Sequence, residues 1–326
     1  MSKHLVYIHY GTIPDYLYDT LEIARSYNKE LSITLITDDT TCFDKLNLIN
    51  INYEYIDFFN SEDYKQFCNI YIHRCDWDTE KIAYKYEIFN FFRFIVMYNF
   101  AKKYNIDYIV YCDSDLSILH NLEDKGCYLD LIKTNDLVLL FSHSTFFSCW
   151  TFKTLENFNK YMYTLYNNDD DLNLVVENIH EIIRDKYHFS DMWLLKSFIY
   201  VNYITINNNF YEHYERIKLK NIESINLNIF FIGNIYKNWS KGILFKNNKN
   251  SDTFRTLVNT YNNHYNLLLD NDTINKLSFN NDNVYMNNEL ELIKDCFKKE
   301  KQQIIHFQGQ SKNLVKFLKN ELIKEI

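Results

Sequence analysis

Short apolar runs typical of β-strands alternate with longer segments of helical apolar spacing through the first half of the chain. No other feature limits the fold as much. Strands are expected at Leu5–His9, Leu31–Ile36, Ile51–Ile56, Asp107–Cys112 and Leu137–Phe141, and helices at Asp15–Asn28 and Glu80–Tyr104. Because strand–helix–strand connections join parallel neighbours, the alternation predicts an α/β fold with a mostly parallel central sheet flanked by helices.

The second half carries a weaker pattern. Helices are expected at Thr154–Tyr166, Ser190–Tyr200, Glu289–Glu300 and Leu314–Ile326, and short apolar runs at Ile229–Ile232 and Gly242–Phe245. We find no internal repeat and no linker rich in Pro, Gly or Ser, so we expect one composite domain over residues 1–326. Residues 1–135 are its expected nucleotide-binding half, and residues 136–326 its expected acceptor half.

Charge and cysteine content exclude several classes of protein. The net charge of −8 argues against a nucleic-acid binder that relies on a general basic field. Seven cysteines without a Cys-x-x-Cys pair argue against a disulfide framework or a cysteine zinc site, and free thiols suit a reducing compartment. The amino terminus does not have the pattern of a signal peptide. The longest apolar stretch, Ile88–Ala101, contains Arg93, so no transmembrane segment is expected.

Codon bias explains the unusual amino-acid usage. The chain has 28 Tyr and 25 Phe, together with many Asn, Ile and Lys, which is typical of AT-rich genes. We therefore give the aromatic count no functional weight. We expect a large DNA virus or a protist as the source, and a cytoplasmic protein, in the host cytoplasm if the source is viral.

The strand that ends at Cys112 is followed directly by Asp113-Ser114-Asp115. Ligands of open α/β sheets bind beyond the carboxyl ends of strands, which is where these carboxylates are expected. Two carboxylates at positions i and i+2 can hold one hard divalent cation, such as Mn²⁺ or Mg²⁺, that bridges to substrate phosphates. A polar turn without function is the alternative, since Asp and Ser are common in turns.

A second polar segment, His306-Phe-Gln-Gly309-Gln-Ser-Lys312, follows the apolar pair Ile304-Ile305. A histidine can complete a metal site, a glycine lets backbone amides approach a phosphate, and a lysine supplies positive charge. With only five glycines in the chain, Gly309 is a candidate for this role. The alternative is the end of a strand followed by a turn.

Arg93 interrupts an apolar helical run just before the Asp113 strand, and such a charge is costly unless it is paired. Arg93, with Lys85 on the same helix, is a candidate for neutralising a diphosphate. The alternatives are pairing with an acidic core residue or a side chain that extends to solvent. Asp191 is a candidate carboxylate at the sugar or acceptor site, and the alternative is that Ser190 or Asp191 only caps a helix. His143, Ser144 and Trp150 are further candidates for lining the same pocket.

These pieces, in this order, resemble the nucleotide-sugar-dependent glycosyltransferases of the GT-A fold, which is Rossmann-like. The strand Tyr108–Cys112 with Asp113 and Asp115 matches the Asp-x-Asp (DxD) strand of that superfamily. His306-x-x-Gly309-x-x-Lys312 is similar to the closing motif of the glycogenin/galactosyltransferase-like group, glycosyltransferase family eight. The segment Ser142–Tyr163 with Ser190-Asp191-Met192 looks like bacterial and viral polysaccharide glycosyltransferases.

The resemblance implies a metal-dependent hexosyltransferase (class EC 2.4) that moves a sugar from a nucleotide diphosphate donor, expected to be a UDP-sugar, to a glycan or glycoprotein acceptor. Asp113, Asp115 and His306 are then the ligands of Mn²⁺ or Mg²⁺. The donor is contacted by Tyr10, Gly11, Asp38, Lys85, Arg93, Ser114, Gly309 and Lys312. Asp191 stands beside the anomeric carbon, as general base in an inverting enzyme or as an orienting group in a retaining one. The Asn-Ala-Gly donor motif and the closing Pro-Trp of the family are missing here, which leaves the donor sugar and the stereochemistry open.

Two rival functions stay open at this point. The first is a phosphotransferase of the haloacid-dehalogenase type, in which an Asp-x-Asp after a strand supplies the nucleophile and the acid. That fold usually carries the motif on its first strand, whereas here it follows residue 110. The second is a non-catalytic carbohydrate-binding relative of the glycosyltransferase fold.

Overall fold

The computed structural model describes residues 2–72, 81–140, 144–183, 189–206, 217–231, 236–239, 304–307, 312, 315–316 and 319–320. The chain forms two compact units, each assembled from several segments. Unit 1 contains Met1–Ile13, Glu30–Ser114 and Asn121–Asn234, and unit 2 contains Pro14–Lys29, Asp115–His120 and Ile235–Ile326. The predicted helix at Glu289–Glu300 and the apolar run at Gly242–Phe245 lie outside the described residues.

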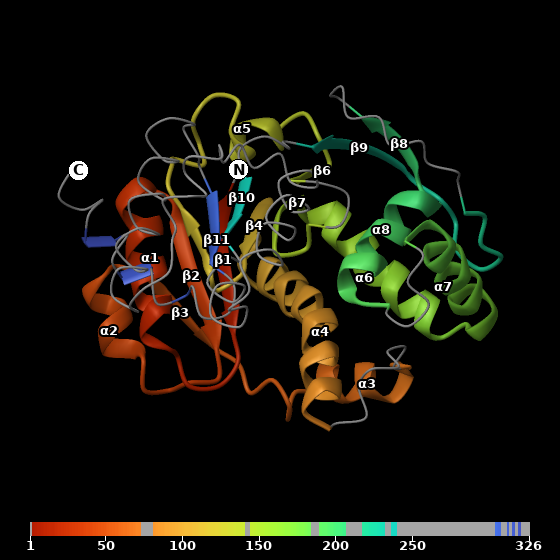
Figure 1. The fold of residues 1–326 in the computed structure, drawn as a ribbon, viewed down its shortest axis with the longest axis horizontal. Helices are drawn as coiled ribbons and strands as arrows, with labels where there is room; N and C mark the ends of the chain where they lie inside the picture. Colours follow the sequence, from red (N-terminus) through yellow and green to blue (C-terminus); the bar gives the residue numbers. More distant parts are fainter. Residues whose placement is uncertain are drawn as a thin grey trace, which may run out of the picture. The chain divides into compact units, whose positions relative to one another are not determined.

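Unit 1 is built on an eight-stranded sheet with the strand order β3-β2-β1-β4-β7-β6-β9-β8 (Figure 1). Its strands are β1 (Lys3–His9), β2 (Ser32–Thr37), β3 (Asn52–Tyr55), β4 (Tyr108–Cys112), β6 (Leu137–Leu139), β7 (Phe147–Thr151), β8 (Tyr203–Ile206) and β9 (Asn226–Phe231). Only β7 runs antiparallel to its neighbours, β4 and β6. The predicted α/β fold with a mostly parallel central sheet is therefore confirmed.

The central strands β1, β2 and β4 are apolar on both faces because both faces are covered. Leu5 of β1 is level with Ile33 of β2 on one side and with Val110 of β4 on the other. All five strands predicted in the first half are present, with ends that shift by one or two residues. This pairing places the carboxyl ends of β1 and β4 side by side.

Seven helices belong to the described part of unit 1. They are α2 (Phe43–Leu48), α3 (Glu62–Ile70), α4 (Lys81–Tyr104), α5 (Tyr128–Leu131), α6 (Phe152–Tyr166), α7 (Asp169–Ile183) and α8 (Asp191–Val201). Helices α6, α7 and α8 pack on one another, and α6 and α8 also contact α4 (Figure 1). The predicted helices at Glu80–Tyr104, Thr154–Tyr166 and Ser190–Tyr200 correspond to α4, α6 and α8.

Helix α4 is buried on every side over its middle. It contacts β4 as well as α3, α6 and α8, and every side chain from Phe91 to Met97 is buried. A helix that is apolar all round is a core helix, so a single apolar stripe is not its pattern here. The covering residues are largely aromatic: Phe94 of α4, Trp150 of β7 and Phe158 of α6 form a cluster with ring centroids 4.8–5.9 Å apart.

Unit 2 contains a smaller sheet and helix α1 (Asp15–Tyr27), the helix predicted at Asp15–Asn28. The sheet order is β10 (Tyr236–Trp239), β11 (Ile304–Phe307) and β5 (Leu116–Ile118). Strand β11 runs parallel to β10 and antiparallel to β5. The described residues of the predicted carboxyl-terminal helix, Val315–Lys316 and Lys319–Asn320, are helical.

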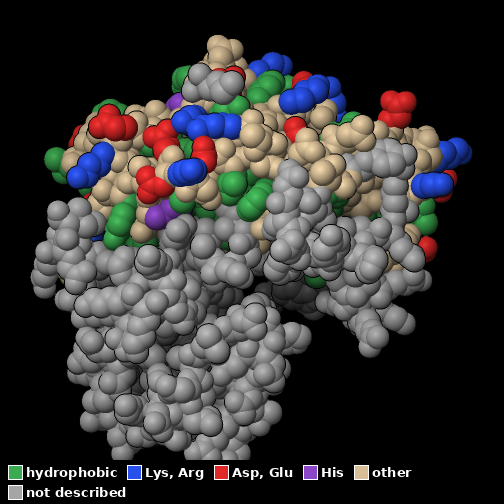
Figure 2. Space-filling model, turned by 90° about the horizontal axis from the view of Figure 1, so that it is seen from above, with side chains coloured by type: hydrophobic (Ala, Val, Ile, Leu, Met, Phe, Trp, Pro, Cys, Tyr) green, Lys and Arg blue, Asp and Glu red, His purple; other side chains and the backbone are tan. Residues whose placement is uncertain are grey.

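No helix among the described residues is long and apolar enough to span a membrane. Among the described residues on the face drawn in Figure 2, Lys and Arg side chains lie next to Asp and Glu side chains. This mixture of charges accords with the net charge of −8 of the whole chain.

The aromatic cluster generates a stability prediction. Phe158→Ala is expected to lower the free energy of unfolding by about 3–5 kcal/mol, because it removes a fully buried ring from a packed core. Leu48→Ala is the control, since Leu48 is 85% exposed and its loss should change the free energy by less than about 0.5 kcal/mol. Urea unfolding followed by circular dichroism measures both, and equal effects of the two substitutions would contradict the described core.

Candidate functional site

The candidate site begins at the carboxyl ends of the central strands. The chain connects β1 to β2 on one side, while β4 joins β1 on the other side, so a topological switch point lies between β1 and β4. Ligands of open α/β sheets bind in the crevice that such a switch point creates. Tyr10-Gly11 follows β1 and Asp113 follows β4, as expected from the sequence. The boundary between the two units falls between Ser114 and Asp115.

A buried arginine organises the site in unit 1. The Arg93 Nη1 atom donates hydrogen bonds to Asp113 Oδ1 at 2.8 Å and to Tyr111 Oη at 3.1 Å. Its Nη2 atom donates to Asp191 Oδ2. The Tyr111 hydroxyl donates to Asp113 Oδ1 at 2.6 Å. We call these four residues, Arg93, Tyr111, Asp113 and Asp191, the Arg93 cluster.

Burial makes the electrostatics of the Arg93 cluster strong. Arg93 is 5% exposed and Asp191 is 4% exposed, whereas 27% of the Asp113 side chain remains exposed. Burial lowers the pKa of Arg93, but Asp191, Tyr111 and Asp113 together raise it by more, so the guanidinium stays charged. Two carboxylates surround one guanidinium, and Asp113 is the most exposed member of the cluster. A partly exposed carboxylate has the donor chemistry that suits a divalent cation.

Local structure explains how these four side chains meet. Tyr111 and Asp113 are two residues apart along β4 and its end, so they point to the same side. Arg93 reaches them from α4, which contacts β4. Asp191 is the first residue of α8, where a carboxylate is favoured by the helix dipole. Ser190 is the N-cap residue of α8 but its side chain makes no cap hydrogen bond, whereas Asp191 is buried against Arg93.

Two buried polar atoms beside this network have no hydrogen-bond partner in the part of the chain that the structure describes. They are Arg93 Nε and Ser190 Oγ. Because an unsatisfied buried polar atom costs free energy, such atoms in a native structure call for a partner such as water or a ligand. Both atoms can donate a hydrogen bond.

Three of the residues predicted to contact the donor, Tyr10, Gly11 and Asp38, lie just after the ends of β1 and β2. The Gly11 N–H donates to Asp38 Oδ1 at 2.7 Å, and Gly11 has a φ of 82°, which favours glycine. The ring of Tyr10, 45% exposed, packs against Phe59 at 4.5 Å between centroids. Lys85 Nζ lies 5.7 Å from the centroid of the same Phe59 ring. Tyr10 and Lys85 therefore both contact the Phe59 ring. Lys85 precedes Arg93 on α4 by eight residues, which correspond to about 12 Å along the helix axis.

Unit 2 holds the second acidic residue of the Asp-x-Asp pair. Asp115 Oδ2 is 2.9 Å from Lys312 Nζ. Lys312 Nζ also lies 3.4 Å from Tyr16 Oη and 5.1 Å from the Tyr16 ring centroid. Burial lowers the pKa of Lys312, but Asp115 and then Tyr16 raise it by more. Lys312 thus contacts the second carboxylate of the Asp-x-Asp segment directly, and its contact with a diphosphate stays a prediction.

The strand that carries His306 lies beside the segment that begins after Asp115. In the antiparallel pairing of β11 with β5, His306 is level with Leu116. The His306 side chain and Gly309 lie outside the described residues, as does His143. Among the described residues, no group of three or more His, Cys, Asp and Glu side chains is placed to hold a metal ion. The carboxylates of Asp113 and Asp115, together with an imidazole, nevertheless have the donor chemistry that suits Mn²⁺ or Mg²⁺.

Two expected pocket residues belong to the core instead. Trp150 is fully buried, and its Nε1 donates to Ser148 Oγ at 2.7 Å. Ser144 is fully buried, and its hydroxyl accepts the Leu140 N–H at 3.0 Å. The expectation that Ser144 and Trp150 line the substrate pocket is therefore wrong, because neither side chain reaches the surface.

The structure adds two residues that the sequence analysis missed. Tyr111 bridges Arg93 and Asp113, and its position two residues before Asp113 in a strand is a signal that was available. Tyr16 contacts Lys312, although the two residues are 296 positions apart in the sequence. No local pattern connects residues so far apart.

Several solved structures are similar to this chain. Mouse xyloside xylosyltransferase 1, in its apo form, is 10% identical, with 78% of this chain and 93% of that chain covered and a TM-score of 0.49. The glycosyltransferase GlyE of Streptococcus pneumoniae is 13% identical over 60% of this chain and 42% of its own, with a TM-score of 0.32. The PaToxG glycosyltransferase is 13% identical over 61% and 69%, with a TM-score of 0.34. No family model and no curated protein sequence matches. At these scores the function has to be argued from the chain's own residues.

The Arg93 cluster generates a prediction about stability. Asp191→Ala is expected to lower the free energy of unfolding by about 3–5 kcal/mol, because it leaves a buried guanidinium short of a partner. Lys153→Ala breaks the surface ion pair with Glu156 and should cost less than about 1 kcal/mol. Urea unfolding measures both. A loss for Asp191→Ala as small as that for Lys153→Ala would contradict the buried pair.

Asp39, in the turn after β2, ties this turn to the one after β1. Its carboxylate accepts hydrogen bonds from the Ile13 N–H at 3.0 Å, the Thr41 N–H at 2.8 Å and the Thr41 hydroxyl at 2.6 Å. These bonds, first that of the Thr41 hydroxyl and then that of Ile13, lower the pKa of Asp39 below its ordinary value of 3.8.

A lowered pKa in the folded state adds stability above the ordinary pKa, and this stability is lost as the pH falls through the folded value. The difference in free energy of unfolding between the wild type and Asp39→Asn is therefore expected to be constant near pH 6 and to shrink below about pH 4. Unfolding series at several pH values measure it. A difference that stays constant down to about pH 2 would contradict the role of the charged carboxylate.

Proposed function

We propose that this chain is a glycosyltransferase that moves a sugar from a nucleotide diphosphate donor, a UDP-sugar, to a glycan or glycoprotein acceptor. The observation that carries this proposal is the acidic pair beyond β4. Asp113 follows a buried central strand at the switch point, and a cation of the protein holds each carboxylate, Arg93 for Asp113 and Lys312 for Asp115. Charge of both signs at this place suits a metal-bound diphosphate.

Asp113, Asp115 and His306 are the proposed ligands of Mn²⁺ or Mg²⁺. When bound, such an ion supplies Lewis acidity that offsets negative charge on a leaving diphosphate. The pairing of β11 with β5 supports this choice, because it brings the backbone of His306 level with Leu116, the neighbour of Asp115. In unit 1, Arg93 and Tyr111 orient the Asp113 carboxylate through its Oδ1 atom.

The cations of the site bind the diphosphate in this proposal. Lys312 contacts Asp115 and Tyr16 in the free protein. When the donor binds, the Lys312 ammonium is proposed to leave the Asp115 carboxylate and to bind the phosphate oxygens. Ser114 and Gly309 are proposed to offer backbone groups to the same phosphates, and Arg93 is proposed to add a positive charge. Fixed charges that face a developing negative charge lower the barrier to departure of the nucleotide.

We propose that the nucleoside binds at the ends of β1 and β2. Tyr10 offers an exposed ring on which a base can stack, and the Gly11 turn, fixed by Asp38, allows the backbone to approach closely. Lys85 beside Phe59 adds a cation near the same ring. Tyr10 and Gly11 follow β1, Asp38 follows β2, and Lys85 belongs to α4. This arrangement is expected for a nucleotide that binds at a switch point.

Asp191 is proposed to stand beside the anomeric carbon. Arg93 already occupies its Oδ2 atom and fixes its orientation. A carboxylate held in this way is better suited to orient the sugar and to stabilise positive charge on it than to take up a proton from the acceptor. This favours the orienting role over that of general base.

Release of free nucleotide from a panel of UDP-, GDP- and CMP-sugars, with and without Mn²⁺, tests the proposal. We expect metal-dependent turnover of one UDP-sugar. Asp115→Ala and Lys312→Ala are each expected to reduce it by at least about 100-fold, the loss typical of removing one charge-stabilising group. Lys319→Ala is the matched control, because Lys319 lies in the same carboxyl-terminal segment but pairs with Asp19 and Glu22.

Full turnover by Asp115→Ala, or by the wild type in excess chelator, would overturn the metal-dependent mechanism. A phospho-enzyme formed on Asp113 would instead favour a phosphotransferase. Circular dichroism of each variant separates loss of activity from loss of fold.

A further inference from the structure

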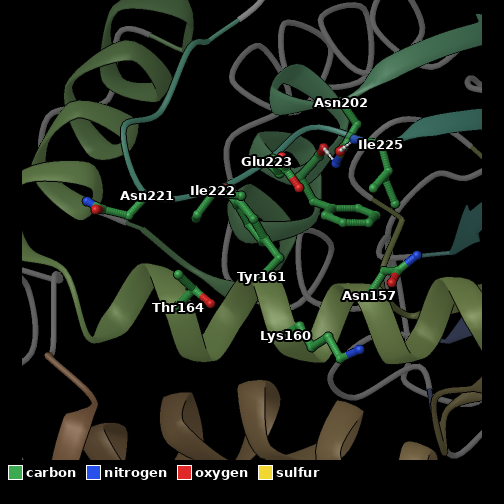
Figure 3. A pocket seen from close by; sticks show the side chains of 10 residues that line it. Asn157, Lys160, Tyr161, Thr164, Asn202, Asn221, Ile222, Glu223 and Ile225 are labelled. Carbon is green, nitrogen blue, oxygen red and sulfur yellow. Dashed lines mark hydrogen bonds between the residues drawn. The ribbon is translucent and has the colours of Figure 1, made fainter.

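Unit 1 contains a pocket of about 220 Å³ that the proposed reaction does not use. Figure 3 shows it between helix α6 and the segment that carries Asn221, Ile222 and Glu223, with Asn202 and Ile225 at one side. Residues 157, 160, 161 and 164 of α6 line it. Their spacing of three to four residues places them on one face of the helix.

The wall opposite α6 is held in place by two buried polar side chains. Asp171, 2% exposed, accepts the N–H groups of Lys220 and Asn221 at 3.0 Å each. Asn202, 7% exposed, accepts the Ile225 N–H at 2.8 Å through its Oδ1 atom. Because both ends of the segment 220–225 are fixed by hydrogen bonds, the pocket is a built feature of unit 1 and not the gap beside a loose loop.

The lining combines apolar and hydrogen-bonding groups. Phe198 and Tyr161 contribute aromatic rings, and Ile222 and Ile225 contribute aliphatic groups. Around them stand groups that donate or accept hydrogen bonds, among them the amide of Asn157, the hydroxyl of Thr164, the ammonium of Lys160 and the carboxylate of Glu223. Lys160 and Glu223 are the charged residues of this lining, and Lys160 also pairs with Glu156 at 3.7 Å, so the rim carries no excess of positive charge.

We propose that this pocket binds a neutral saccharide residue. A sugar ring has an apolar face that packs on aromatic and aliphatic groups, and hydroxyls that both donate and accept hydrogen bonds, as the rim does. Because Glu156 and Glu223 offset the charge of Lys160, the pocket has no net attraction for a phosphate. The volume is below the range of about 300–1,000 Å³ typical of drug-sized ligands, so it suits a single small ring.

The pocket is separate from the Arg93 cluster. Asp191 begins α8, whereas Phe198 and Asn202 lie at the other end of that helix. Phe198 and Asn202 follow Asp191 by seven and eleven residues, which correspond to about 10–16 Å along the helix axis. A saccharide bound here does not reach the reacting atoms, and its binding does not depend on the proposed transfer activity.

Saturation-transfer-difference NMR on the full chain, without nucleotide or metal, tests this proposal. The probes are glucose, galactose, xylose, N-acetylglucosamine, maltotriose, cellotriose and chitotriose. We expect signals from at least one of them. For that sugar, Lys160→Ala should raise the Kd at least fivefold, and Thr164→Trp, which fills the pocket from an exposed helix position, should abolish the signals.

Lys153→Ala is the matched control, since Lys153 lies on the same helix and is similarly exposed. It also pairs with the same Glu156, but it is not part of the lining. It should leave the Kd within twofold of the wild type, and so should Asp115→Ala, which removes a residue of the proposed catalytic site. Absence of signals from every probe would overturn the proposal, and so would a Kd that rises in Asp115→Ala but not in Lys160→Ala. Melting temperatures of the variants confirm folding.

Discussion

The placement of one guanidinium inside unit 1 determines much of what surrounds it. Arg93 lies in the middle of α4, where its neighbours from Phe91 to Met97 are all apolar and buried. A charge in such surroundings is tolerated only if it is paired and hydrogen-bonded. Asp113 and Asp191 supply the opposite charges and Tyr111 supplies a hydroxyl. The pairing therefore joins α4 to the end of β4 and to the start of α8.

This interaction links stability to the candidate chemistry. The same contacts that neutralise Arg93 orient Asp113 at the switch point and Asp191 at the start of α8. A change that loosens the packing of α4 is thus expected to move the carboxylates as well. The requirement also explains why the apolar helix carries an arginine at all, since a leucine there would leave two acidic residues without their partner.

The sequence predicted those parts of the fold that depend on local patterns. Buried strands such as Leu5–His9 and Asp107–Cys112 are apolar runs, and their alternation with helices implied the parallel sheet. Asp113 and Asp115 were found because a strand end is readable from the sequence. The roles of Tyr16 and Trp150 were not predictable, because they depend on which distant segments meet. Trp150 lies close to Ser148 and Thr151 in the sequence, yet its side chain on β7 is fully buried in the core. For Arg93, the sequence showed that a partner was needed but left its identity open.

The central claim is that Asp113, Asp115 and His306 hold one divalent cation that binds the diphosphate of a nucleotide sugar. A crystal structure of the chain with Mn²⁺ and UDP, with the metal located by anomalous scattering, tests it most directly. We predict a single strong anomalous peak in contact with both carboxylates, the His306 imidazole and the diphosphate oxygens. A peak elsewhere, or a His306 side chain remote from the two carboxylates when UDP is bound, would contradict the account.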